Sequence, residues 1–210
     1  MQPIFITGIG TGIGKTIVSA IVAEALGADY WKPVQAGYEN GTDTLIVKEF
    51  LSKSNVHPEL YKLELAASPH IAARAEGIQI DLNKIYEQFI KLNISGRRLV
   101  IEGAGGIMVP LNEKEFVADL IKKLNAKVIL VSRNYLGSIN HSLLTAELCR
   151  THGLDVAGWI FNDQYLDYED EIASWSGFSK IGSIQFTDQP DRKFIQEQAE
   201  SIRSSLQKII

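Results

Sequence analysis

The sequence has 210 residues, of which 45% are hydrophobic and 22% are charged, and its formal net charge at pH 7 is −4. This length and composition predict one globular domain and argue against a disordered chain, a collagen or a coiled coil. The charge balance offers no basic surface for nucleic acid or membrane, and a single cysteine excludes an intrachain disulfide. We therefore expect a cytoplasmic protein with no signal peptide in its first residues, MQPIFITGIG, and no membrane-spanning segment.

Short apolar runs alternate with longer segments of helical periodicity, which predicts an α/β fold with a mostly parallel central sheet and helices on both faces. Most of the apolar runs are continuous, as expected for strands that are buried on both sides. We predict strands at residues 4–7, 30–34, 99–102, 128–132, 156–162 and 181–184. We predict helices at residues 15–26, 44–52, 82–92, 116–124, 138–151 and from about 192 to 206. Residues 54–77 have weak periodicity and two prolines, so we expect an irregular segment with a short helix there.

A glycine-rich segment, TGIGTGIGKT (residues 7–16), joins the first predicted strand to the first predicted helix. Glycines allow the backbone N–H groups of such a loop to surround an anion, and the helix N-terminus adds partial positive charge. Lys15 can then reach the β and γ phosphates of a nucleotide, and Thr16 can offer its hydroxyl to Mg²⁺. The loop is a variant, because Ile9 stands where the strict spacing requires the first glycine. A plain glycine turn and a dinucleotide site are the alternatives, and the Lys-Thr pair disfavours the second.

The next predicted strand, within YWKPVQAG (residues 30–37), contains a lysine among apolar residues. A buried ammonium needs anionic partners, because an unpaired buried charge is costly. A bound triphosphate facing Lys32 would provide them, and the alternative is a lysine at a sheet edge whose amine reaches solvent. Asp43 follows just before a predicted helix, where it suits both a helix cap and a Mg²⁺ ligand.

Two later strands end in polar residues, and in a parallel sheet the carboxyl ends of the strands form the edge where ligands bind. Glu102 ends one of them and is followed by the glycine-rich residues 103–106. A carboxylate there can hold Mg²⁺ beside a phosphate, and a solvated turn residue is the alternative. Asn162 ends the other strand with a donor and an acceptor that suit the adenine edge. Asp163 is a second candidate for the metal, but no glycine-rich segment follows it.

Together these motifs resemble those of the dethiobiotin synthetase family, ATP-dependent carboxylases that close the ureido ring in biotin synthesis. The resemblance spans nearly the whole chain. It rests on motifs in family order: TGIGKT (11–16), KPVQAG (32–37), SPHIA (68–72), EGAGG (102–106), LGSINH (136–141) and AGWI with Asn162-Asp163 (157–163). The chain departs from the family pattern at Gly10, Gly12, Ala36 and Gln185.

The resemblance implies a homodimer of single-domain P-loop NTPase subunits, with one ATP-dependent carboxylase domain over residues 1–210. The implied reactants are ATP with Mg²⁺, CO2 and 7,8-diaminononanoate. One amine takes up CO2 as a carbamate, the carbamate oxygen attacks the γ-phosphoryl group, and the second amine displaces phosphate to close the ring. The implied catalytic residues are Lys32, Lys15 and Thr11, and the implied metal ligands are Thr16, Asp43 and Glu102.

The resemblance also implies which residues contact the nucleotide and the diamine. The implied nucleotide-binding residues are Gly12, Ile13, Gly14, Lys15, Thr16, Ile17, Asp43, Glu102, Gly103, Ala104, Gly105, Asn162, Asp163, Gln185, Phe186 and Thr187. The implied substrate-binding residues are Lys32, Ala36, Ser138, Ile139 and Asn140. The last three begin a predicted helix whose N–H groups would receive the substrate carboxylate from the neighbouring subunit, and an ordinary helix start is the alternative.

Two other classes of protein share features of this sequence. Nucleotide-switch ATPases of the partitioning and cell-division type have the same fold, but they usually carry an extra lysine early in the phosphate loop. Residues 8–14 contain no lysine. A small-molecule kinase or another ATP-dependent amide-forming synthetase of cofactor synthesis is the third possibility.

Overall fold

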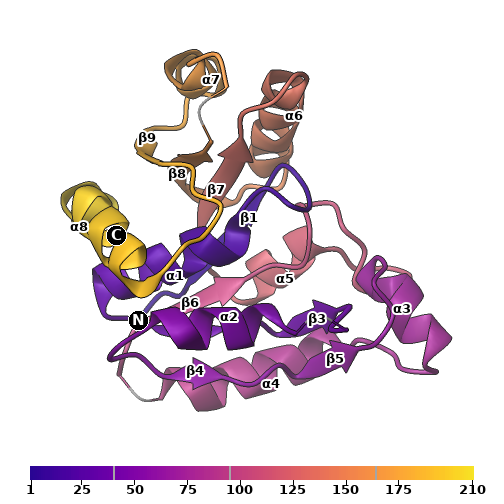
Figure 1. The fold of residues 1–210 in the computed structure, drawn as a ribbon. Coiled ribbons are helices and arrows are strands. Elements are labelled where there is room, and N and C mark those ends of the chain that lie inside the picture. Colours follow the sequence, from indigo (N-terminus) through magenta and orange to yellow (C-terminus); the bar gives the residue numbers. More distant parts are fainter. Residues whose placement is uncertain (40, 95, 164) are drawn as a thin grey trace.

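A seven-stranded sheet forms the centre of the molecule (Figure 1). The computed structural model describes residues 1–39, 41–94, 96–163 and 165–210. The strand order is β4-β2-β6-β1-β7-β8-β9, and each pair of neighbours is parallel, as predicted. The strands are β1 (Ile4–Gly8), β2 (Asp29–Trp31), β4 (Val56–His57), β6 (Leu99–Glu102), β7 (Lys127–Arg133), β8 (Asp155–Asn162) and β9 (Lys180–Ile184). A separate parallel pair is formed by β3 (Val34–Ala36) and β5 (Tyr61–Leu63).

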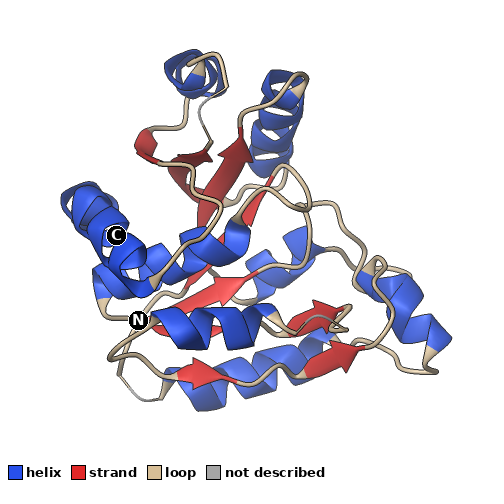
Figure 2. Cartoon of the chain, in the orientation of Figure 1, coloured by secondary structure: helices blue, strands red, loops and turns tan. Residues whose placement is uncertain are grey.

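Helices cover both faces of the sheet (Figure 2), which confirms the predicted α/β architecture. One face packs against α1 (Lys15–Leu26), α2 (Asp43–Phe50) and α8 (Arg192–Ile209). The other packs against α4 (Leu82–Asn93), α5 (Val117–Lys123), α6 (Ser138–Thr151) and α7 (Glu169–Ser176), with α3 (Pro69–Ala75) beside it. In β1 the side chains alternate, so Ile4 and Ile6 contact the first core and Phe5 contacts the second.

The strand predicted at residues 30–34 is confirmed only in part, because the chain leaves the central sheet in the middle of it. β2 ends at Trp31, and β3 begins at Val34 and pairs with β5 instead of with the central sheet. Pro33 has no N–H group to donate to a neighbouring strand, which explains why pairing stops there. Lys32 therefore lies in the break between two strands and not inside one.

Besides the separate strand β3, the sequence does not predict β4, β5 and α7. The strands β4 and β5 have two and three residues, too short to show periodicity. The start of α7 has three acidic residues, and Gly177 ends it in the left-handed conformation at φ 68°. Both are ordinary helix boundary signals. The short helix expected within residues 54–77 is α3, and the other predicted helices are confirmed with small shifts at their ends. Within the described ranges, no helix is long and apolar enough to cross a membrane.

Candidate active site

The glycine-rich loop connects the end of β1 to the start of α1. Gly12 and Gly14 have φ of 71° and 89°, in the left-handed region that favours glycine. A Cβ atom on Gly14 would lie 2.0 Å from Nδ2 of Asn162, whose side chain donates to the carbonyl of Ile13 at 3.0 Å. The end of β8 thus supports the loop from one side and requires glycine at position 14.

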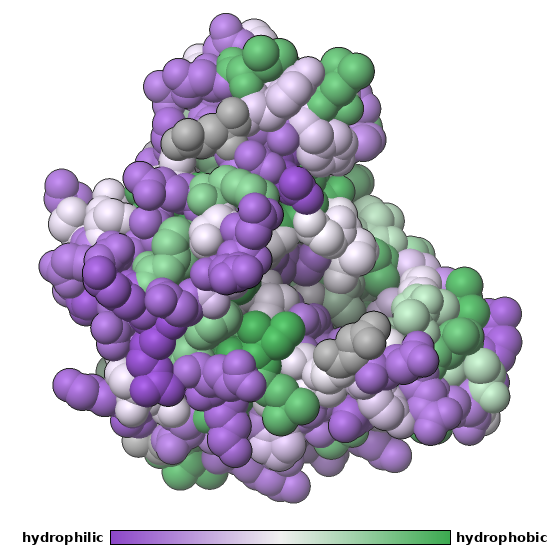
Figure 3. Space-filling model, viewed as in Figure 1, coloured by the Kyte–Doolittle hydropathy of each residue, from purple (hydrophilic) through white to green (hydrophobic). Residues whose placement is uncertain are grey.

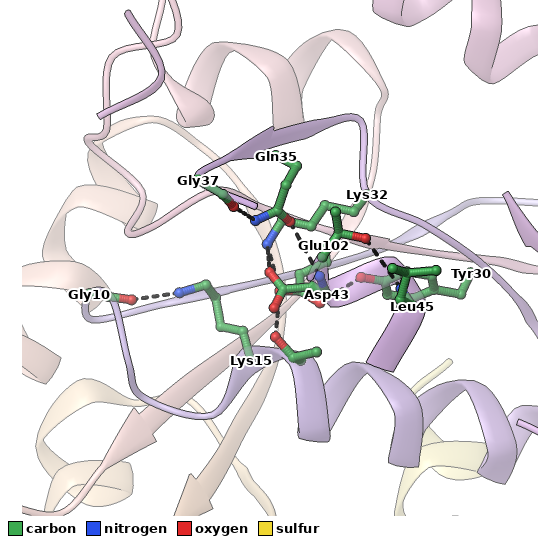
Figure 4. Close-up of polar contacts among 11 residues, drawn as sticks. Gly10, Lys15, Tyr30, Lys32, Gln35, Gly37, Asp43, Leu45 and Glu102 are labelled. Carbon is green, nitrogen blue, oxygen red and sulfur yellow. Dashed lines mark hydrogen bonds and ion pairs between the residues drawn. The ribbon is translucent and has the colours of Figure 1, made fainter. Parts of the chain in front are cut away.

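Lys15, the first residue of α1, is 7% exposed and donates from Nζ to the carbonyl of Gly10 at 2.6 Å. Its ammonium therefore lies inside the curve of the loop (Figure 4). Burial lowers the pKa of Lys15 to about 8, although the negative charge of Glu102 opposes this shift. An anion bound in the loop would relieve that penalty, because it would give the buried ammonium a charged partner.

Glu102 ends β6 between β1 and β2 and is 1% exposed. Its two carboxylate oxygens have different partners. Oε1 accepts from the hydroxyl of Thr16 at 3.1 Å, and Oε2 accepts from the hydroxyl of Tyr30 at 2.8 Å. Burial and the nearby Glu102 charge raise the pKa of Tyr30 well above its ordinary value, so the phenol keeps its proton and donates.

Lys32 lies between two carboxylates. Its Nζ donates to Oε1 of Glu102 at 3.0 Å and forms an ion pair with Asp43 (Figure 4). Burial alone would lower the pKa of Lys32, but the charges of Glu102 and Asp43 outweigh it and raise the pKa. Lys32 is therefore a buried cation with partners and not a sheet-edge lysine in solvent, since it is 6% exposed.

Asp43 is the first residue of α2, and it does not cap this helix. The N-cap is Thr42, whose side chain accepts from the backbone N–H of Leu45. The Asp43 carboxylate is thus available to Lys32. Gln35 holds this segment in place, because its Oε1 accepts from the N–H of Asp43 at 3.4 Å and its Nε2 donates to Gly37 at 2.8 Å. The sequence did not single out Gln35 or Tyr30 as site residues.

Lys15, Thr16, Lys32, Asp43 and Glu102 all line one cavity of about 740 Å³. Many of the residues singled out in the sequence line it: Thr11, Gly12, Gly14, Lys15, Thr16, Ile17, Lys32, Ala36, Asp43, Glu102, Ala104 and Gly105. The remaining lining residues are Gln35, Ile46, Ala66, Ala67, Ser68, Pro69 and Val109. A cavity of this size, with two lysines and two carboxylates along one wall, can hold a polyanionic ligand together with a second small molecule.

A smaller recess of about 120 Å³ contains Asn162, which is predicted to contact adenine, and other predicted nucleotide-binding residues. Its lining includes Gly12, Gly14, Ile17, Asn162, Asp163, Gln185, Phe186 and Thr187. Asp163 forms an ion pair with Arg133 at 3.1 Å, whereas Glu102 contacts Thr16 and Lys32, so the structure favours Glu102 over Asp163 as a metal ligand.

Several residues predicted to contact the nucleotide or the diamine are not among the described residues lining the large cavity. Gly103 donates its N–H to the carbonyl of Ile6 at 2.9 Å, and the side chain of Ile13 packs in the core, so the contribution of both is through backbone. Ser138, Ile139 and Asn140 are not among the described residues that line the cavity. The hydroxyl of Ser138 is buried and hydrogen-bonds to that of Tyr168 at 2.7 Å. Their role as substrate ligands stays a prediction that needs a second chain.

The donor set fits Mg²⁺. Thr16, Asp43 and Glu102 provide one hydroxyl and two carboxylates, which are the hard oxygen ligands this ion prefers. In the part of the chain that the structure describes, no group of three or more His, Cys, Asp or Glu side chains forms a metal site of its own. This is expected of Mg²⁺ in nucleotide sites, which use one or two carboxylates with phosphate oxygens and water.

Comparisons with known proteins show the fold and the family of this chain. The model of a family described as an AAA domain matches residues 2–193. Among solved structures, the MinD cell division protein of Aquifex aeolicus matches with a TM-score of 0.61 and 15% identity, covering 99% of this chain and 96% of that one. A ParA family ATPase from Chlorobium tepidum matches with a TM-score of 0.56 and 15% identity, over 99% and 93%. At this identity the likeness shows the fold alone, a P-loop NTPase fold.

Curated relatives are much more similar in sequence. A protein of Christiangramia forsetii named ATP-dependent dethiobiotin synthetase BioD is 46% identical over 205 residues, which are 96% of each chain. A protein of the same name from Cytophaga hutchinsonii is 51% identical over 164 residues, 77% of each chain. The chain belongs to the ATP-dependent dethiobiotin synthetase family.

Proposed function

We propose that this chain is a single ATP-dependent carboxylase domain, residues 1–210, that acts in the cytoplasm. It converts 7,8-diaminononanoate, CO2 and ATP into dethiobiotin, ADP and phosphate. The observation that carries this proposal is the convergence of Lys15, Lys32, Asp43 and Glu102 on one cavity beside the glycine-rich loop. Membership of the dethiobiotin synthetase family supports the choice of substrate.

The site has residues that would hold Mg²⁺ together with ATP. Thr16, Asp43 and Glu102 would hold it, because they bring hard oxygen ligands to the end of the phosphate loop. The ion would supply positive charge next to the phosphate oxygens, where negative charge accumulates during transfer.

The two lysines have separate tasks. Lys15 binds the β and γ phosphates from within the loop, and the hydroxyl of Thr11 lies at the rim of the same cavity. Lys32 faces the second reactant. The carbamate formed from one amine and CO2 is an anion that attacks a polyanion, so a cation between the two lowers their repulsion in the transition state. Bond formation from the carbamate oxygen to the γ phosphorus releases ADP, and attack by the second amine on the carbamate carbon then releases phosphate.

Lys32 would change partners in this reaction. In the structure it pairs with Asp43 and Glu102, the two carboxylates that also suit Mg²⁺. With Mg²⁺ held by the two carboxylates, the ammonium of Lys32 would be available to the carbamate and the transferred phosphoryl group.

The diamine would lie along the wall formed by Ala36 and residues 66–69, between Lys32 and solvent. Its carboxylate tail would reach Ser138, Ile139 and Asn140 of a second copy, since these residues are outside the cavity of their own chain. Hydrophobic residues at the surface over α6 and α7 support a homodimer (Figure 3). Leu136, Leu144 and Trp175 are all more than half exposed there.

Isotope incorporation tests the proposed reaction directly. The purified chain is incubated with ATP, Mg²⁺, 7,8-diaminononanoate and ¹³C-labelled bicarbonate, and the products are analysed by mass spectrometry. We expect a cyclic urea that carries one labelled carbon per molecule and one ADP formed with it. Formation of ADP without a labelled product would contradict the proposal, and a phosphorylated diamine would indicate a small-molecule kinase.

A further inference from the structure

Tyr30 is a fully buried tyrosine directly beneath the candidate active site. It pairs with Val100 in the parallel register of β2 and β6, so its side chain lies on the same face of the sheet as those of Val100 and Glu102. Both neighbours point toward α1, and the tyrosine ring extends along the strands until its hydroxyl reaches Oε2 of Glu102 at 2.8 Å (Figure 4).

This hydrogen bond divides the Glu102 carboxylate into two unlike oxygens. Oε2 faces the core and accepts a hydrogen bond from the hydroxyl of Tyr30, whereas Oε1 accepts hydrogen bonds from Thr16 and Lys32 at the cavity. A buried carboxylate oxygen without a donor is costly, so the Tyr30 hydroxyl both satisfies Oε2 and opposes rotation of the carboxylate about its last bond.

We propose that Tyr30 is a positioning residue that keeps Oε1 of Glu102 turned toward Thr16 before nucleotide and metal bind. This inference rests on the proposed function, because it assumes that Glu102 holds Mg²⁺ with the bound nucleotide. Hydrogen bonds that orient a ligating carboxylate strengthen metal binding, since the ligand then loses less freedom when the ion arrives. Tyr30 itself touches neither reactant.

The test is the affinity of the protein–ADP complex for Mn²⁺, measured by electron paramagnetic resonance of the free ion, in wild type and in Tyr30→Phe. We expect about tenfold to hundredfold weaker Mn²⁺ binding in the variant. We expect the affinity for ADP in the absence of metal to stay the same. An Mn²⁺ affinity within about twofold of wild type, in a folded variant, would overturn the proposal.

Tyr61→Phe is the matched control. Its hydroxyl also has a hydrogen bond, accepting from the N–H of Asp81 at 3.0 Å, and the residue is not among those that line the cavity. A purely structural role for Tyr30 predicts lower thermal stability in both variants with unchanged Mn²⁺ binding. An equal loss of Mn²⁺ affinity in the two variants would also contradict a specific role for Tyr30.

A second measurement does not depend on the folding of a variant. In a crystal structure of the wild-type protein with ADP and Mn²⁺, we expect the hydroxyl of Tyr30 to stay within hydrogen-bond distance of Oε2. Glu102 turned away from Tyr30 in that complex would overturn the proposal. Neither measurement uses the diamine, so a failure of ring closure in the wild type would count against the proposed function and leave the result for Tyr30 distinct.

Discussion

Lys32 is the residue on which the proposed chemistry most depends. It pairs with Asp43 and Glu102 at the cavity, and in the proposed reaction it would face the carbamate and the γ-phosphoryl group. We expect Lys32→Ala to lower the rate of dethiobiotin formation by about 100- to 1,000-fold, because the variant loses a preorganised cation in the transition state. We expect ATP binding, measured by calorimetry, to stay largely intact, since Lys15 and the loop are unchanged.

Lys48→Ala is the control for this variant. Lys48 is an exposed lysine in the last turn of α2, on the same helix as Asp43, so its removal changes the net charge equally without touching the cavity. Full turnover by Lys32→Ala would remove the assigned role, and loss of activity in Lys48→Ala would show that the effect reflects overall charge.

A substitution at Gly14 tests whether the close contact between the glycine-rich loop and Asn162 is needed for ATP binding. Gly14→Ala places a Cβ atom 2.0 Å from Nδ2 of Asn162 at a φ of 89°, so either the loop or Asn162 must move. We expect at least about tenfold weaker ATP binding, because that displacement and the strain together exceed about 1.4 kcal/mol. Gly27→Ala at the other end of α1 is the control, since its φ is 58° but nothing lies within 4 Å of its Cβ position. Equal ATP binding by both variants would contradict this account.

The sequence could predict those site residues whose chemistry is unusual for their local position. A lysine beside an apolar run and a glutamate between a strand and a glycine-rich segment both indicate function. In the structure, Nζ of Lys32 lies 3.0 Å from Oε1 of Glu102. Tyr30 and Gln35 could not be singled out, because a tyrosine in a strand is ordinary. The position of the Tyr30 hydroxyl depends on the register of β2 against β6, and no local sequence pattern specifies that register.

At the scale of the elements, long segments with clear periodicity were predictable and short or interrupted ones were not. α1 and α6 match their predicted ranges because periodicity and the flanking glycines agree. The apolar run through residues 30–34 predicts one strand, but Pro33 lacks the N–H that a central strand needs, so pairing with the central sheet stops before it. The partner of Val34–Ala36 is β5, a contact between distant segments that only the folded chain defines.

The only cysteine allows a prediction for α6. Cys149 is fully buried, and burial raises the pKa of its thiol from the ordinary 9.0 to about 12. We therefore expect no alkylation by iodoacetamide at pH 8 in the native protein and complete alkylation in denaturant. Rapid alkylation of the native protein would contradict the burial of this thiol.

The same thiol makes the stability of the protein depend on pH. Between pH 9 and 12 the native thiol keeps a proton that the unfolded thiol loses, so this group makes the free energy of unfolding fall as pH rises. The difference in unfolding free energy between wild type and Cys149→Ala, measured across that range, isolates the contribution of the thiol.

At the scale of the whole molecule, the proposed site needs two chains. We expect sedimentation to give twice the 23.3 kDa mass of one chain. Leu136→Asp, at an 88% exposed position just before α6, should shift the protein toward monomer and reduce diamine binding. Ile90→Asp, at an exposed position on α4, is the control and should remain dimeric. A wild-type monomer with full activity would contradict the shared site.

The fold alone does not decide what the bound ATP is used for. A MinD cell division protein and a ParA family ATPase have the same architecture at 15% identity, and function depends on the site that each protein carries. In the proposed function of this chain, the two lysines and two carboxylates around one cavity bind an anionic second reactant beside the triphosphate. ATP cleavage should therefore depend on that reactant.

Phosphate release, followed with each reactant omitted in turn, is the most direct test of this claim. We predict near-background release with ATP and Mg²⁺ alone, and also when either the diamine or bicarbonate is left out. Release should become rapid only when both are present, with one phosphate for each dethiobiotin formed. Strong ATP hydrolysis without the diamine would contradict the account and would favour a nucleotide-switch ATPase.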